Sequence, residues 1–206
     1  MLYASDFVTP VSTPRLTVRG MSVLAAHLDS PLKFANPKDL AGVAAGLIGC
    51  VYVLADAAGA IWYVGASKST SRSVLARPQD YIRWAGEHMA ALAAGPDVAS
   101  DLQDGLLDHA WTAPIVRMIA AHHITVVKVA PVVQGQSVEV AESSVAALCT
   151  MVSGVPAFGS GVWEIKSGTA RAAGWEAAQT AIERLREAEA ARDRAAASTS
   201  PAATDA

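Results

Sequence analysis

The sequence predicts a mixed α/β domain of the α+β kind, in which helices flank a small, mainly antiparallel three-stranded sheet. Two β-rich runs, 50–54 and 60–64, flank residues 56–59, where Asp56 comes first and Gly59 last, as is typical of a type I turn. A third β-rich run, 124–129, follows later in the chain. Alanine occupies about a fifth of the positions, which favours helices around the sheet.

The first two β-rich runs are apolar at nearly every position, so the side chains on both faces of each strand should be buried. We therefore expect both strands of the hairpin to lie in the middle of a covered sheet. Hydrophobic residues make up 52% of the 206 residues, enough for a single domain to bury a core.

Helices are expected at 37–45, opened by Pro37, and over 65–95, with a break at Pro78. Two more are expected within 96–121, the first carrying a solvated acidic face, and another over 137–152. A last helix should begin near Ala170 and pack through the stripe Trp175, Ala178, Ile182 and Leu185.

These elements divide the chain into four parts. Residues 1–38 form an N-terminal extension with a small helix around 21–27, and residues 39–167 form the central domain. Residues 168–195 form a C-terminal helix, and 196–206, rich in alanine, serine and threonine, form a disordered tail.

The net charge of −3 argues against a strongly basic nucleic-acid coat, although a local basic groove stays compatible with it. Cys50 and Cys149 both lie in apolar surroundings, so we expect small core residues in a reducing compartment and not a disulfide. Because no signal peptide or membrane span is visible, a cytoplasmic protein is expected. A monomer is slightly favoured over a dimer through the C-terminal helix.

The hairpin carries two tripeptides, Cys50-Val51-Tyr52 and Tyr63-Val64-Gly65. Together they resemble the signature of the GIY-YIG nucleases, and the resemblance covers residues 47–165. It implies that Tyr52 and Tyr63 lie on adjacent strands as catalytic tyrosines, and that Gly65 lets the backbone turn into the following helix. Cys50 departs from the family pattern, which has glycine there.

The helix after the third β-rich run carries Glu142, which resembles the metal-binding glutamate of that family. The resemblance implies that Glu142 holds Mg²⁺ or Mn²⁺, both of which accept carboxylate oxygens. Residues 156–159 resemble the Pro-x-aromatic-Asn element, with Gly159 in place of the asparagine.

The catalytic arginine implied by the resemblance has three candidates. Arg83 is preferred because Arg83-Trp84 followed by His88 resembles the family's arginine helix, whereas Arg72 has the better spacing from Gly65. Arg77, which precedes a proline, ranks third.

The implied chemistry is hydrolysis of a DNA phosphodiester by a metal-dependent endonuclease. An arginine would stabilise the charge on the phosphoryl oxygens. Free tyrosine has a pKa of about 10, so a nearby cation would have to lower it before Tyr52 could accept a proton. Tyr63 or His88 would orient the attacking water.

Two alternatives remain open. The same fold with weakened chemistry could bind nucleic acid or a protein without cutting, as the missing asparagine and the ambiguous arginine suggest. An unrelated α/β structural domain could also carry these residues, because tyrosines on adjacent strands often only pack in the core, and a helical glutamate is usually solvated.

Overall fold

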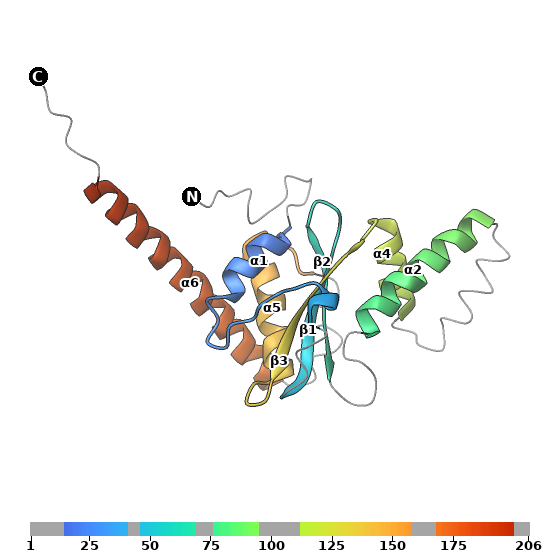
Figure 1. Cartoon of the computed structure of the whole chain (residues 1–206), viewed down its shortest axis with the longest axis horizontal. Helices are drawn as coiled ribbons and strands as arrows, with labels where there is room; N and C mark the ends of the chain where they lie inside the picture. Colours follow the sequence, from blue (N-terminus) through green and yellow to red (C-terminus); the bar gives the residue numbers. More distant parts are fainter. Residues whose placement is uncertain (1–14, 41–45, 69–75, 95–111, 158–167, 200–206) are drawn as a thin grey trace, which may run out of the picture.

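The computed structural model describes residues 15–40, 46–68, 76–94, 112–157 and 168–199 (Figure 1). Its sheet contains β1 (Leu47–Ala55), β2 (Ile61–Lys68) and β3 (Val126–Val133) in the order β2-β1-β3, with both pairings antiparallel. The predicted fold class, a small antiparallel sheet flanked by helices, is confirmed.

The turn between β1 and β2 is built on Asp56. Its carboxylate accepts hydrogen bonds from the amides of Ala58 and Ala60, both at 3.0 Å, and from Trp62 Nε1 at 2.9 Å. Gly59 closes the turn with φ +84°, a conformation that glycine adopts without strain. The hairpin predicted from this segment is confirmed, and the side chain of Asp56 holds it together.

Helices cover both faces of the sheet, in two groups (Figure 1). On one face lie α1 (Val18–Ala25), α5 (Val138–Ser153) and α6 (Gly168–Thr199), and on the other lie α2 (Ala76–Ala94) and α4 (Thr112–Ala121). Strand β1 is central, and its last seven residues are buried. The expectation that both hairpin strands are central was wrong for β2, which is an edge strand because β3 pairs with the other side of β1.

The N-terminal segment belongs to the core that it was expected to flank. Helix α1 begins after Thr17, whose hydroxyl accepts a hydrogen bond from the amide of Gly20 at 3.0 Å. Five apolar side chains from this segment are at most 5% exposed and pack with β1 and α5: Leu16, Met21, Leu24, Leu28 and Leu32. Ala35 then pairs with Val129 at the outer edge of β3.

Two predicted helices differ from the structure. Pro37 opens η2 (Pro37–Leu40), a single 3-10 turn, and residues 41–45 lie outside the described part of the chain. The segment predicted as helical from Gly65 begins as strand, since β2 continues to Lys68. Pro78 causes no break, because it is the third residue of α2 and the first turn of a helix needs no donor from its amide. The expected acidic helix face lies outside the described residues.

Helix α6 packs on α5 through Ala178 and Leu185 of the predicted stripe, but not through the predicted tryptophan. Gly174, Ala178, Ala181 and Leu185 are buried along one stripe, whereas Trp175 is 46% exposed. The helix runs to Thr199, so residues 196–199, predicted as tail, form its last turn, in keeping with the high helix propensity of alanine. None of the described helices combines the length and apolar character needed to cross a membrane.

Candidate active site

Tyr52 and Tyr63 lie together on the face of the sheet that α2 and α4 cover. Their rings stack with centroids 5.9 Å apart and planes inclined by 26°. They belong to a buried group that we call the tyrosine cluster: Cys50, Tyr52, Leu54, Tyr63, Tyr81, Ala85, Ile115, Val116, Ile119, Ile124 and Val129. Tyr52 is 0% exposed and Tyr63 is 1% exposed, so both are core residues in this conformation.

Both tyrosine side chains pack against Gly65. It is paired directly with Tyr52 across the two strands. A Cβ atom at position 65 would lie 2.6 Å from Tyr63 Cε1, 2.7 Å from the Tyr52 hydroxyl and 2.8 Å from Tyr52 Cζ. Gly65 was expected to let the backbone turn into the next helix, but it lies in the middle of β2. Its role is to leave room for the two tyrosine side chains, because it has no side chain of its own.

Tyr81 is the member of this cluster that sequence reasoning missed. It lies on α2, is 0% exposed, and meets Tyr63 edge to face with centroids 6.1 Å apart. Trp84 packs against Tyr81 in a similar way at 5.9 Å. The signal was available, because Tyr81, Ala85 and His88 recur at the spacing of an inward-facing helical stripe.

Glu142 is buried on α5, the helix that follows β3. The stripe of α5 that faces the sheet contains Val138, Glu142, Val145 and Cys149, all at most 6% exposed. Glu142 is 5% exposed and places a carboxylate in this otherwise apolar stripe. The interpretation of Glu142 as a solvated surface residue is thereby excluded. Burying a carboxylate is costly, which makes Glu142 a candidate for a role other than packing.

The tyrosine pair and Glu142 approach the sheet from opposite faces. Tyr52 packs with α2 and α4, whereas its neighbours Val51 and Val53 pack with α5. The Glu142 carboxylate and the tyrosine hydroxyls could act on one substrate only at the outer edge of β2, where the two faces of the sheet adjoin. The hydroxyl of Tyr52 is directed there, since it reaches across Gly65 on the edge strand. The convergence of Glu142 with the two tyrosines is part of the proposal below.

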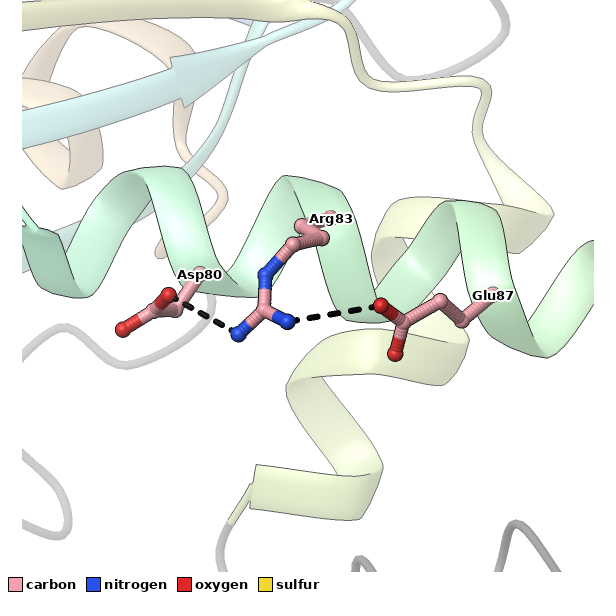
Figure 2. Close-up of polar contacts among 3 residues, drawn as sticks. All are labelled: Asp80, Arg83 and Glu87. Carbon is pink, nitrogen blue, oxygen red and sulfur yellow. Dashed lines mark hydrogen bonds and ion pairs between the residues drawn. The ribbon is translucent and has the colours of Figure 1, made fainter.

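Arg83 does not join the tyrosines. Its guanidinium lies on the outer face of α2, 3.1 Å from Asp80 and 3.4 Å from Glu87 (Figure 2), and its side chain is 59% exposed. Arg83 lies two positions after Tyr81, a turn of about 200° around the helix, so the two side chains point in different directions. Arg72 and Gly159 lie outside the described residues, and nothing is described of the Arg77 side chain.

His88 is on the inward side of α2 but distant from the tyrosine pair along the helix. It is 5% exposed, and its Nδ1 has no hydrogen-bond partner in the described part of the chain. It lies seven positions after Tyr81, which amounts to about 10 Å along the helix axis. The role implied for His88, orienting a water at Tyr52, stays a prediction.

The other polar and sulfur-containing groups near the sheet have structural roles. Neither Cys50 nor Cys149 forms a disulfide, and burial raises the pKa of both thiols to about 12, so neither is a ready nucleophile. At the hairpin end, His122 stacks on Trp62 with centroids 3.6 Å apart, and the guanidinium of Arg15 lies 4.0 Å from the centre of the same indole. These contacts attach the N-terminal segment and α4 to the hairpin.

A metal ion at this site would have few protein ligands. Across the described ranges, no group of three His, Cys, Asp or Glu side chains is placed to hold one. The carboxylate of Glu142 is of the donor type that Mg²⁺ and Mn²⁺ accept, and Mg²⁺ is commonly held by one or two carboxylates together with waters and substrate phosphate. The donor chemistry therefore fits a single-carboxylate site.

Comparison of the chain with models of protein families, with curated proteins and with solved structures gave no significant match.

Proposed function

We propose that this protein is a metal-dependent phosphodiester hydrolase of GIY-YIG type that acts on DNA. The observation that carries the proposal is the buried Glu142 carboxylate on the helix after β3, together with the tyrosine pair stacked over Gly65 on the adjacent strands β1 and β2. Tyrosines on adjacent strands are common in a core, whereas the carboxylate buried in the apolar stripe of α5 is a ligand of the type that Mg²⁺ and Mn²⁺ accept.

Glu142 is the residue that would hold Mg²⁺ or Mn²⁺, and the ion would neutralise charge on the phosphoryl oxygens when bound. Because Glu142 is only 5% exposed, a hydrated ion can reach it only when the side chains that cover it are displaced. Tyr52, ionised as a phenolate, would take a proton from the attacking water and become a neutral phenol, and Tyr63 would hold the Tyr52 ring by stacking. Arg72 is the arginine retained in the proposal, since Arg83 is paired with carboxylates on the outer face of α2.

Nicking of supercoiled plasmid DNA by the purified chain, with Mg²⁺ or with EDTA, tests this proposal. Tyr52→Phe keeps the ring and removes only the hydroxyl, so it should slow cleavage by about 10²-fold or more. Tyr81→Phe is the matched control, because it removes the same atom from a ring on α2, and it should keep most of the rate. Arg83→Ala should also cut at nearly the normal rate, because its side chain is exposed and faces away from Tyr81.

A second function, nucleic-acid or protein binding without cleavage, is favoured by one observation. Both tyrosines are almost fully buried, so a phosphate cannot touch the Tyr52 hydroxyl in this conformation. Wild-type protein that binds DNA and never nicks it in Mg²⁺ or Mn²⁺ would refute the hydrolase and support this binding module.

A further inference from the structure

A shallow groove of about 570 Å³ lies between η2, the start of β3 and α2. Its apolar lining includes Ile82 and Val127, and its polar lining comes from Asn36, Lys38, Gln79, Thr125 and Lys128. The groove adjoins the tyrosine cluster, because Ile82 and Val127, which line it, also pack against that cluster.

The charged groups of the groove are both cationic. Lys38 is exposed and forms no ion pair with a described residue. Lys128 Nζ donates a hydrogen bond of 2.7 Å to Asn36 Oδ1, which fixes the ammonium group at the groove wall. Asn36 in turn donates to Asp39 at 2.9 Å, and Asp39 is not part of the lining. No carboxylate lines the groove, although the chain as a whole carries a net charge of −3.

We propose that this groove binds the sugar–phosphate backbone of a nucleic-acid strand, with Lys38 and Lys128 each facing a phosphate. The proposal rests on the DNA substrate of the proposed function and supplies a place to hold it. An acidic protein needs a local cationic surface to retain a polyanion, and this groove is such a surface. Gln79 and Thr125 add neutral donors for phosphate or sugar oxygens, and Ile82 and Val127 offer apolar contact to the sugars.

The size of the effect follows from counterion release. Each phosphate contact contributes about 0.9 to the slope of log affinity against log salt concentration. Loss of both lysines should therefore make the slope shallower by about 1.8. The ratio of wild-type to variant affinity should then be about sixtyfold larger at 0.1 M salt than at 1 M salt. Because these contacts read phosphates, the loss should not depend on the DNA sequence.

Fluorescence anisotropy of a labelled duplex in EDTA, at several salt concentrations, measures this with the full chain and without cleavage. The test variant is Lys38→Gln with Lys128→Gln, and the control is Lys33→Gln, an exposed lysine of the same segment that does not line the groove. Because Lys128 has a structural partner, a second variant, Gln79→Glu, adds a negative charge on α2 and removes no described hydrogen bond. Its control is Ala90→Glu, at an exposed position on the same helix.

Loss of affinity and slope in both groove variants, with both controls unchanged, supports the groove. Groove variants that bind DNA like wild type overturn the groove proposal. If wild type cuts plasmid DNA in that case, the proposed hydrolase activity is still supported. Groove variants that lose binding in a protein that never cuts support the groove and refute the hydrolase. Wild-type protein that does not bind DNA, or that binds polyglutamate equally well, overturns the assignment to nucleic acid.

Discussion

Replacement of Gly65 by alanine tests the packing of the tyrosine pair directly. The added Cβ would lie 2.6–2.8 Å from two ring carbons, one in Tyr52 and one in Tyr63, and from the Tyr52 hydroxyl oxygen. Carbon atoms in contact are normally about 3.5–4.0 Å apart, so the rings would have to move by about 1 Å in a core with no free space. Overpacking of this kind costs about 1–3 kcal/mol.

At about 2–4 °C per kcal/mol for a chain of this size, Gly65→Ala should lower the melting temperature by about 2–12 °C. Gly86→Ala is the matched control, because no atom lies within 4 Å of the new Cβ and the position is exposed on α2. It should stabilise the protein by about 0.5–1 kcal/mol, since alanine is the better helix former. Thermal unfolding followed by circular dichroism measures both. Wild-type stability in Gly65→Ala would refute the role given to this glycine.

Three further predictions concern the framework. Gly174→Ala should destabilise by about 3 kcal/mol or more, measured by urea unfolding, because its Cβ would overlap Ser143 and lie 2.7 Å from an α5 backbone nitrogen; normal stability would show that α6 shifts freely. Asp56→Ala should cost about 1–3 kcal/mol in the same assay, because it leaves three donors without their acceptor; a neutral result would mean that the turn needs no side-chain support. Desolvation, followed by the charge of Arg15, lowers the pKa of His122, so the folded state disfavours its protonation. The stability it contributes is present above a pH of about 6.5 and is lost as the pH falls from that value through the lower pKa of the folded state, so His122→Gln should flatten the fall of melting temperature between pH 7 and pH 5.

The sheet could be predicted from the sequence because its signals are local. Apolar runs separated by Asp56 and Gly59 specify a hairpin, and the third strand is similarly apolar. The edge position of β2 could not be predicted, because it depends on which side of β1 receives a strand from more than 60 residues away. The role of Gly65 could not be predicted either, because the overlap of a Cβ atom at this position with Tyr52 depends on the pairing register between the two strands.

Side-chain direction explains the differences at the helices. The context of Arg83 suggested a catalytic arginine, but the inward stripe through Tyr81 and Ala85 already directs position 83 toward solvent. Trp175 was expected to dock α6 because it is large and apolar. A close helix crossing needs a small residue instead, and the neighbouring Gly174 provides it. Burial of Glu142 depends on how α5 meets the sheet, which composition does not reveal.

The rate of plasmid cleavage by Glu142→Gln tests the central claim most directly. Glutamine keeps the shape of the side chain and removes the charge that would hold the metal, so the variant should fold normally by circular dichroism. Under single-turnover conditions with saturating Mg²⁺, its rate should fall at least about 10²-fold below that of wild type. Glu176→Gln, at an exposed position on α6, should cut normally. A folded Glu142→Gln variant that cuts at the wild-type rate would contradict the assignment of Glu142 and, with it, the proposed active site.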